Sequence, residues 1–318
     1  MTMKINLTHP TTMPLISTIG FICLAVVSLG ADIPMGSSTV PAGIRQSLIL
    51  YYDFDSPPLA GKVADKSGHG NDGLAVNVAF VNDGHKGGAA KFGLTDSYIT
   101  VTNKDELNPP RLTLAAWIKI SYTDRVCRRI FDKGFSKGYD LTMDGDSIDK
   151  QGKPVRGRVG IEPGKTYSFS GIQVADGKWH HVAGTFDGKD AKVYVDGALV
   201  GKPGHWVGEI PQTPYDLTIG ANRSNPDGSL GEIGASFNGL MDDVMMFNRA
   251  LSADEIQTLF KSQGGVLAPQ SAQPSAPAAT QLKKSAEERI KEAKQLFDQG
   301  LINKDDYDRK VKEILDSI

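Results

Sequence analysis

The chain has 318 residues, a length that suggests about two domains. Its formal net charge is −2, with 23% charged residues, so it has neither the basic field that recruits nucleic acid nor an acidic excess. Hydrophobic residues make up 40% of the chain and glycine occurs 35 times, which is typical of a soluble protein with many short strands and tight turns.

Residues 1–31 have the pattern of a secretory signal peptide. Lys4 and His9 precede the apolar run "PLISTIGFICLAVVSLGA", which ends in small residues at Gly30 and Ala31. An apolar run of roughly sixteen residues is short for a membrane span and suits a signal peptide. We therefore expect export into the periplasm, the cell envelope or the medium, with an uncleaved N-terminal membrane anchor as the alternative.

Removal of this signal leaves Cys127 as the single cysteine. The mature chain then has no intrachain disulfide, and its fold rests on its core or on a metal. Arg125, Arg128 and Arg129 surround Cys127 in "DRVCRRIF", and we expect these arginines to be solvated or salt-bridged. Whether Cys127 is reactive or forms an intermolecular bridge is left open.

Short apolar or alternating runs separated by loops rich in Gly, Asn, Asp and Pro follow from about residue 47. About a dozen such strands, with no long helical period before the last quarter, predict a mostly β fold: an antiparallel two-sheet jelly-roll sandwich. The predicted strands are "SLILYYDF", "AAKFG", "SYITV", "LTLAAWIKI", "YDLTM", "GRVGI", "HHVAGTF", "AKVYVDG", "DLTIGA" and "GLMDDVMMF".

The pair His180-His181 invites a metal-site interpretation, but it lies at the start of the predicted strand "HHVAGTF". Neighbouring side chains on a strand point to opposite faces, so these two rings cannot chelate one ion together. Val182 and Phe186 share a face with His180 and can pack beside Val193 of the next strand. We predict a structural role for the pair.

The C-terminal part changes to a helical period. Ser252 and Glu255 form a capping box before a short amphipathic helix, and Ser285 and Glu288 form another. A hairpin of about 34 residues rarely folds alone, so we expect it to bind a second copy or a partner. The predicted organisation is signal peptide 1–31, N-terminal extension 32–46, sandwich 47–262, flexible Pro/Ala/Ser-rich linker 263–284 and α-helical hairpin 285–318.

Six motifs in order resemble the bacterial laminin-G-like branch of the concanavalin A-like lectin/glucanase superfamily: "YYDFD", "DKSGHGNDG", "LTLAAWIKI", "KWHHVAGTFDG", "VYVDG" and "FNGLMDDVMMFNRALSADEI". The resemblance covers most of residues 47–261 and implies a jelly roll, carbohydrate or protein binding, and often one structural calcium ion. The segment "LFDQGLINKDDYDRKVKEIL" looks like the short C-terminal helical hairpin domain known as SHOCT, which implies oligomerisation or partner contact.

Calcium prefers several oxygen ligands, and these residues can supply them: Asp242, Asp53, Asp55, Asp65 and Asn71. Asp242 shares strand parity with Val244 and Met246, so we expect it to point inward, where an isolated carboxylate is costly unless it is hydrogen-bonded or bound to a cation. The resemblance implies that Asp242, which matches an aspartate of related sandwiches, joins a metal site near the first strand. A carboxylate satisfied by backbone amides is the alternative, and Asp243 is expected to be exposed.

Catalysis is not expected. The glycosidases of the superfamily place paired carboxylates on one strand, roughly E-x-D-x-x-E, and this chain has no such strand. Glu162, Glu209 and Glu232 are scattered among Gly and Pro residues. The sequence also contains no G-x-S-x-G motif, P-loop or dinucleotide fingerprint.

Two loop-like stretches, "GHWVGEIPQTPY" and "ANRSNPDG", combine aromatic rings with amide and charged groups, as a glycan site requires. The predicted ligand-binding residues are Trp206, Tyr215, Asn222, Arg223, Asn225 and Asp227. Tyr167 and Phe169 are further candidates, whereas Trp117 within "LTLAAWIKI" is expected in the core.

These features together predict an exported, non-catalytic protein that recognises carbohydrate through a calcium-stabilised jelly roll, with the C-terminal hairpin mediating self-association or docking. A structural protein that binds only extracellular or cell-envelope proteins is the first alternative. A divergent polysaccharide-acting enzyme is the second. The identity of the glycan does not follow from the sequence.

Overall fold

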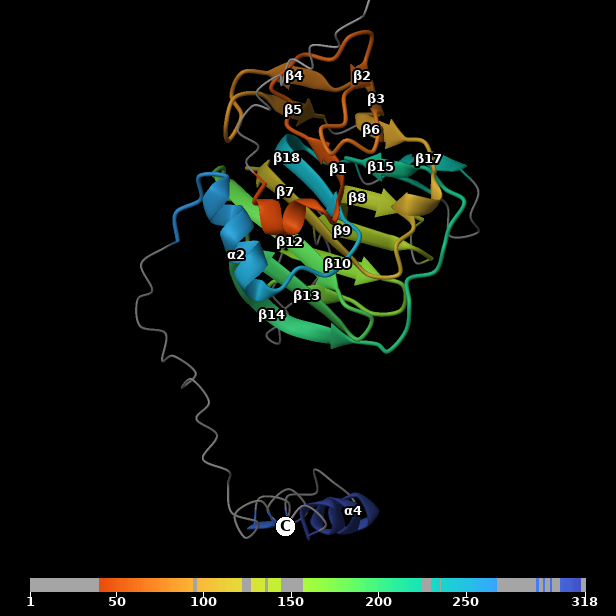
Figure 1. The fold of residues 1–318 in the computed structure, drawn as a ribbon, viewed down its shortest axis with the longest axis vertical. Helices are drawn as coiled ribbons and strands as arrows, with labels where there is room; N and C mark the ends of the chain where they lie inside the picture. Colours follow the sequence, from red (N-terminus) through yellow and green to blue (C-terminus); the bar gives the residue numbers. More distant parts are fainter. Residues whose placement is uncertain are drawn as a thin grey trace, which may run out of the picture. The chain divides into compact units, whose positions relative to one another are not determined.

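The computed structural model describes residues 40–93, 96–121, 127–134, 137–143, 157–224, 230–234, 236–267, 290, 291, 294, 298 and 304–315. The described strands form two antiparallel sheets stacked face to face (Figure 1). The predicted mostly β, two-sheet jelly-roll sandwich is therefore confirmed. Within the same residues, no helix combines the length and apolarity needed to cross a membrane.

The first sheet, called sheet A, consists of these described strands: β1 (Leu48–Tyr52), β4 (Ala79–Val81), β5 (Ala89–Phe92), β7 (Leu112–Lys119), β12 (Trp179–Phe186), β13 (Asp190–Val195), β14 (Ala198–His205) and β18 (Gly239–Phe247). Their spatial order is β14-β13-β12-β7-β18-β5-β4, and β1 also pairs with β18. Strands distant in sequence thus meet at the centre, where β7 lies between β12 and β18.

The second sheet, called sheet B, consists of these described strands: β2 (Lys62–Val63), β3 (Gly73–Val76), β6 (Tyr98–Val101), β8 (Arg128–Lys133), β9 (Tyr139–Met143), β10 (Val159–Pro163), β11 (Ser168–Phe169) and β15 (Leu217–Ile219). Their order is β11-β10-β9-β8-β15-β6-β3-β2. A separate hairpin pairs β16 (Asn222–Ser224) with β17 (Leu230–Gly234), and a short 3-10 helix, η1, spans Asp105–Leu107.

All ten predicted strands occur, but the sequence pattern misses several others. β14 is an edge strand that carries Pro203 and has mostly exposed side chains. Proline is tolerated at a sheet edge, where its missing N–H is not needed. β8 begins with Arg128 and Arg129, whose charges conceal the apolar alternation of a strand.

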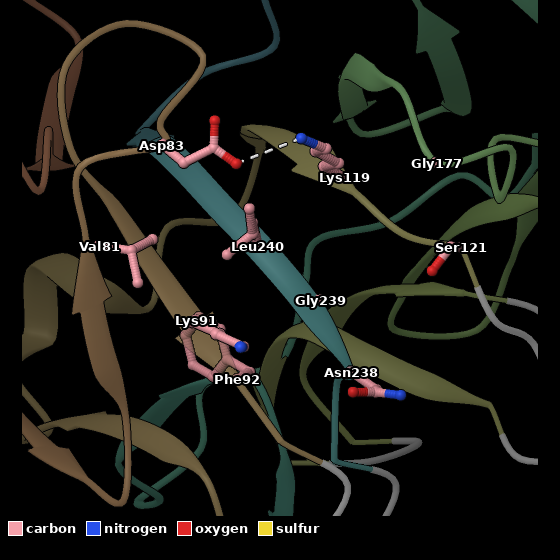
Figure 2. A pocket seen from close by; sticks show the side chains of 10 residues that line it. All are labelled: Val81, Asp83, Lys91, Phe92, Lys119, Ser121, Gly177, Asn238, Gly239 and Leu240. Carbon is pink, nitrogen blue, oxygen red and sulfur yellow. Dashed lines mark hydrogen bonds and ion pairs between the residues drawn. The ribbon is translucent and has the colours of Figure 1, made fainter.

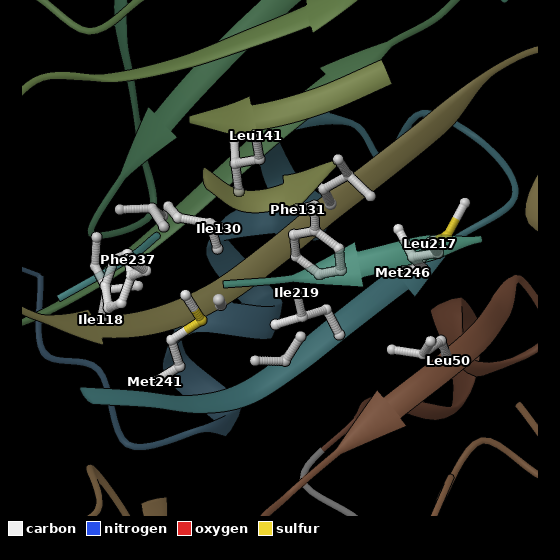
Figure 3. Packing of buried hydrophobic residues seen from close by; sticks show 14 of the residues in the cluster. Leu50, Ile118, Ile130, Phe131, Leu141, Leu217, Ile219, Phe237, Met241 and Met246 are labelled. Carbon is white, nitrogen blue, oxygen red and sulfur yellow. The ribbon is translucent and has the colours of Figure 1, made fainter. Parts of the chain in front are cut away.

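The main core lies between the two sheets, as alternation along each strand dictates. Figure 3 shows side chains of both sheets interleaved there, among them Ile118 and Met241 from sheet A and Phe131, Leu141 and Ile219 from sheet B. All five side chains are buried. A core of this size accounts for a stable fold without disulfides.

Helix α2 (Ala253–Ser262) covers part of the outer face of sheet A (Figure 1). The predicted capping box is present, since the Glu255 backbone N–H donates to Ser252 Oγ at 3.2 Å and the Ser252 N–H donates to Glu255 Oε2 at 2.8 Å. Ile256 and Leu259 pack on the sheet. Helix α1 (Ala42–Arg45) buries Ile44 in the same cluster, so the end of the predicted N-terminal extension packs on the sandwich.

Trp117 is buried as predicted, but it lies on the outer face of sheet A rather than between the sheets. The His85 ring stacks on it with centroids 3.4 Å apart, and Phe260 of α2 stacks at 5.5 Å. Trp117 Nε1 donates to Gln263 Oε1 at 3.3 Å. The packed region therefore extends to Gln263, just past the predicted boundary at residue 262.

In the predicted C-terminal hairpin, helix α4 (Lys304–Leu315) corresponds to the second expected helix. Lys304 Nζ pairs with Asp308 at 2.9 Å, one turn further along. Positions 290, 291, 294 and 298 of the first expected helix are also helical. The remaining residues of that helix, the signal peptide and most of the linker lie outside the described residues, so the likeness to the SHOCT hairpin stays a prediction.

Candidate functional site

His180 and His181 lie on opposite faces of β12, as predicted. His180 is held between two carboxylates, with Nδ1 2.8 Å from Asp196 and Nε2 3.1 Å from Asp176. These contacts raise the pKa of His180, chiefly through the hydrogen bond with Asp196. His181 is buried at the outer face, edge-on to Trp117 at 5.5 Å. The pair does not share a ligand site.

Two of the predicted calcium ligands instead organise the first long loop. Asp65 Oδ1 accepts the backbone N–H groups of Tyr51 and Ser67, and Asp65 Oδ2 accepts the Ser67 hydroxyl and the Asn71 N–H, all at 2.7–2.9 Å. The Asn71 side chain donates to the Ile49 carbonyl at 2.7 Å. With its acceptor positions used by the loop, Asp65 is a loop-ordering residue in this structure.

The predicted orientations of Asp242 and Asp243 are wrong, because β18 contains a bulge. The β7–β18 ladder shifts register between Asp242 and Met245, and Asp243 has a positive φ of 47°. Met241 and Val244 both enter the intersheet core, which strict alternation forbids for residues three apart. Asp242 therefore lies on the outer face opposite Trp117, and Asp243 is buried rather than exposed.

Both carboxylates are nevertheless buried and polar-bonded. Asp242 accepts the Lys86 N–H at 3.0 Å and the Asp243 N–H at 2.7 Å, as the backbone-amide alternative anticipated. Asp243 Oδ1 accepts the Tyr51 hydroxyl at 2.6 Å, while its buried Oδ2 has no hydrogen-bond partner among the described residues. Asp55 accepts the Gly88 N–H at 3.0 Å nearby.

Neighbouring carboxylates in this group raise the pKa of Asp242 and of Asp243. Burial, and then the neighbouring Asp243 charge, raises the pKa of Asp242 to about 8. Burial also raises the pKa of Asp243 to about 6, with Asp53 and Asp55 adding to the rise. Within the described part of the chain, no group of three or more His, Cys, Asp or Glu side chains is arranged as a metal site. The structure thus gathers acidic side chains whose ionised forms are disfavoured, and the described residues do not define a coordination shell.

The predicted glycan-binding residues are only partly described. Trp206 is half-buried and stacks on the core residue Phe186 with centroids 5.4 Å apart, so its ring is not an open platform. Tyr215 is half-buried and its ring lies over Gly134. Asn222 lies on β16, whereas the side chain of Arg223 and the residues Asn225 and Asp227 lie outside the described parts. A binding role for this set stays a prediction.

The outer face of sheet B holds an ionic cluster that the sequence did not suggest. Asp132, Asp140 and Glu162 are directly opposite one another on β8, β9 and β10. Arg129 Nε lies 3.3 Å from Asp132 and 3.6 Å from Asp140, and an Arg129 Nη donates to the Thr142 hydroxyl at 2.6 Å. Arg129, Asp132 and Asp140 are all buried, so the expectation of a salt-bridged arginine is confirmed for Arg129.

Cross-strand register also builds a row on the outer face of sheet A. Lys91 of β5 is directly opposite Ala79 of β4 on one side and Leu240 of β18 on the other. Leu240 is also opposite Lys119 of β7, and Lys119 is opposite Trp179 of β12. Directly opposite residues on neighbouring strands bring their side chains together on one face. Five strands distant in sequence therefore contribute to one continuous row.

This row borders an open pocket of about 380 Å³. Figure 2 shows Leu240 between Lys91 and Lys119, with Asn238 and Ser121 further along the pocket. Lys119 Nζ pairs with Asp83 at 3.4 Å and lies 6.0 Å from the centroid of the Trp179 ring. The pocket thus combines an apolar floor, an adjacent aromatic ring, two ammonium groups, and amide and hydroxyl groups.

The sequence analysis did not select Lys91, Lys119 or Asn238. The available signal was a single lysine within each of the apolar strands "AAKFG" and "LTLAAWIKI", at a position where alternation points it to solvent. Which solvent-facing residues become neighbours depends on the strand order, and that order is not readable from one sequence.

Solved structures share the fold at low identity. The binding domain of Paraclostridial Mosquitocidal Protein 1 aligns with a TM-score of 0.53 and 15% identity, over 69% of this chain and 53% of that chain. This chain thus spans about half of that structure. Domain 4 of AbnA, a GH43 extracellular arabinanase from Geobacillus stearothermophilus solved with arabinotriose, aligns with a TM-score of 0.51 and 18% identity, over 67% of this chain and 98% of that domain.

No curated protein matches the chain. A family model described as "Concanavalin A-like lectin/glucanases superfamily" matches residues 93–257, slightly more than half of the sequence. This range contains most strands of both sheets, including β7, β12 and β18 at the centre of sheet A. By the sequence match and by its two-sheet sandwich, the chain belongs to the concanavalin A-like lectin/glucanases superfamily.

Proposed function

We propose that the protein is a non-catalytic binding protein that holds a saccharide in the pocket on sheet A. The observation that carries this proposal is the pocket's composition. Sugars present apolar C–H faces and many hydroxyl groups, so they suit a site that combines an aromatic ring and an apolar floor with a few polar groups. Leu240 and Asn238 line the pocket and supply the apolar floor and the polar group, and the half-buried Trp179 ring lies next to it, 6.0 Å from Lys119 Nζ.

Two further points support binding rather than catalysis. The acidic groups that are adjacent on sheet B, Asp132 and Asp140, are buried, so a polysaccharide chain has no direct access to them as acid and base. In addition, domain 4 of AbnA shares the fold and was solved with arabinotriose. Saccharide binding by such a domain is compatible with this architecture.

Binding of the full-length protein to a panel of neutral and charged polysaccharides tests this proposal. We expect saturable binding to at least one class, reduced by Trp179→Ala. Tyr167→Ala is the matched control, because Tyr167 is an aromatic residue with 65% of its surface exposed that directly precedes β11 of sheet B, whereas Trp179 is directly opposite the pocket residue Lys119. If no polysaccharide binds a protein whose circular dichroism shows an intact sheet fold, the proposal is wrong.

A structural calcium ion is part of the proposal, with a reduced ligand set. Asp242, Asp243 and Asp55 are mutually repulsive and partly buried, and a divalent cation relieves such repulsion. The unpartnered Oδ2 of Asp243 is an available ligand atom. Asp53 lies close enough to raise the pKa of Asp243, whereas Asp65 and Asn71 serve the first loop.

Export and self-association complete the proposal and rest on the sequence alone. The apolar segment before Asp32 has the length of a signal peptide, and the hairpin predicted over residues 285–318 would be too small to be stable without a docking surface. Light scattering on the full chain and on a chain ending at residue 284 tests the second point. A smaller assembly is expected after truncation, and an unchanged mass contradicts it.

A further inference from the structure

The pocket on sheet A carries more positive charge than neutral-sugar recognition requires. Lys91 and Lys119 lie on either side of Leu240, on β5 and β7, with β18 between them. Both line the pocket, and Asp83 is the one acidic residue among the described residues that line it (Figure 2). Strands two apart in a sheet are separated by roughly 10 Å, so the two ammonium groups can approach one ligand from both sides.

We propose that this pocket selects anionic saccharides, whose carboxylate or sulfate groups pair with Lys91 and Lys119. This inference rests on the proposed function, because it names the class of sugar that the same pocket takes. Lysine ammonium groups act as flexible point charges, so they do not impose the fixed bidentate geometry of arginine. The pocket therefore suits an acidic group on a saccharide of variable linkage.

Lys91 is available to such a ligand. Its side chain is exposed, and no acidic partner is found for it within the described residues. Other lysines near acidic residues are engaged, as in the pairs Lys62–Asp72 at 2.8 Å and Lys192–Asp187 at 3.7 Å. An ammonium group that has no ion-pair partner and lies at the edge of a pocket can bind an anionic ligand.

The ion pair of Lys119 with Asp83 can be replaced by an ion pair with a ligand. The present pair spans 3.4 Å, and the Asp83 side chain is 74% exposed. Exposed ion pairs of this kind contribute little to stability, so a ligand anion can replace Asp83 at small cost. Asp83 occupies the position that a ligand carboxylate would take, beside the same ammonium group.

The uncharged part of the pocket fits the rest of a sugar. Leu240 forms an apolar floor between the two lysines, and the Trp179 ring lies beside Lys119. Asn238 and Ser121 present an amide and a hydroxyl group on the far side of Gly239 (Figure 2). An anion without a sugar ring would leave these groups unused, which favours an acidic saccharide over a free inorganic anion.

A second pocket, of about 360 Å³, does not share these features. It is lined by Phe54, Pro57 and Pro58 beside Lys62 and Lys66. Both of these lysines face aspartates, Asp72 at 2.8 Å and Asp53 at 3.9 Å. Of these two pockets, only the one on sheet A is lined by a lysine, Lys91, for which the described residues provide no acidic partner.

The test compares ligands that differ only in charge. The full-length protein is titrated with polygalacturonate and with its fully methyl-esterified form, and, as the sulfate arm, with dextran sulfate and with unsulfated dextran. We expect the acidic polymers to bind at least about tenfold more tightly than their neutral counterparts, and the preference to shrink as salt screens the charges.

Lysine variants then locate the charge effect. Lys91→Gln and Lys119→Gln are each expected to weaken binding of the acidic polymers roughly fivefold, the scale of one exposed ion pair. Asp83→Asn is expected to tighten binding. Lys202→Gln is the matched control, since Lys202 is an exposed lysine of β14 outside the pocket, and it is expected to bind as the unaltered chain does.

The outcomes separate the two proposals. Equal affinity for polygalacturonate and its methyl ester, or lysine variants that bind like Lys202→Gln, overturns the selection of anionic saccharides while leaving saccharide binding intact. Failure of every polymer to bind overturns both. None of the four substitutions changes a buried side chain, so unchanged thermal unfolding is expected and verifies that each variant is folded.

Discussion

The two outer faces of the sandwich hold basic side chains in opposite ways. On sheet B, Arg129 is buried between Asp132 and Asp140. On sheet A, Lys91 and Lys119 border an open pocket, and Asp83, the one acidic group among its described lining residues, is largely exposed. Strand register creates both groups, because each one is assembled from neighbouring strands.

The difference shows how burial decides the role of a charge. A buried ion must have partners, since losing water without compensation is very costly, so Arg129 is committed to the fold. A solvated ammonium keeps its water and can exchange it for a ligand anion at small cost. We therefore expect the first group to contribute to stability and propose the second for binding, and substitutions should separate these roles.

Removing the buried cation should have the largest effect. Arg129→Met leaves Asp132 and Asp140 buried without their cation, and we expect the free energy of unfolding to fall by about 3–5 kcal/mol. Urea unfolding measures this change. Arg111→Met is the control, because Arg111 is half-exposed and its ion pair with Glu209 spans 4.0 Å. Equal losses of unfolding free energy for the two variants would show that the buried Arg129 stabilises the fold no more than an exposed arginine does.

The two aspartates of the cluster should differ. Asp132 is the nearer partner of Arg129, whereas burial holds the pKa of Asp140 well above its usual range. Burial therefore favours the neutral form of Asp140, while Asp132 makes the shorter contact with Arg129. Asp140→Asn, which mimics the protonated acid, should reduce stability less than Asp132→Asn in the same urea experiment. The reverse order would contradict this assignment.

His181, which lies under helix α2, should make the free energy of unfolding decrease as the pH falls. Burial lowers the pKa of His181 to about 4 from its usual 6.5; Asp196 opposes this shift and His85 adds to it. The neutral ring therefore stabilises the fold fully above pH 6.5, and this stability is lost as pH falls through 4. The loss amounts to about 3 kcal/mol for such a shift.

The measurement is the unfolding free energy between pH 7 and pH 4. His181→Phe should weaken its pH dependence, because phenylalanine has no proton to gain. His205→Phe serves as the control, since the His205 side chain is 60% exposed. If both variants follow the pH dependence of the unaltered protein, the burial of a neutral His181 is not what limits stability in acid.

Calcium should have an intermediate effect. At about a hundredfold its Kd, a ligand that binds only the folded state adds about 2.7 kcal/mol. Thermal unfolding with calcium, with magnesium and with chelator tests this, and Asp242→Asn should remove the response to calcium. Asp254→Asn, at an exposed position in the first turn of α2, should retain it. No shift with calcium in the unaltered protein would exclude the proposed ion.

The smallest stability effect is expected in the pocket. Lys91→Gln and Lys119→Gln should change the unfolding free energy by less than about 0.5 kcal/mol, as surface substitutions usually do, although both weaken binding. Compared with Arg129→Met, these variants would show that Arg129 is required for folding, whereas Lys91 and Lys119 are required for the ligand. A large loss of stability in either lysine variant would remove the contrast between the two faces.

Much of the fold could be read from the sequence. Alternation in "HHVAGTF" and "LTLAAWIKI" predicted their strands, and Ser252 with Glu255 marked the start of α2. These features are local, because side-chain direction and helix capping depend on residues a few positions apart. The motifs also identified the superfamily, which the match over residues 93–257 confirms.

The candidate site could not be read in the same way. One bulged residue at Asp243 reversed the expected directions of Asp242 and Asp243, and nothing in "MDDVMM" marks it. Likewise, Lys91, Lys119 and Leu240 are ordinary residues until β5, β18 and β7 become neighbours. The sequence alone determined which residues share a face along each regular strand, but only the tertiary structure decided where a bulge interrupts that alternation and which residues meet, because cross-strand neighbours are set by long-range pairing of the sheet.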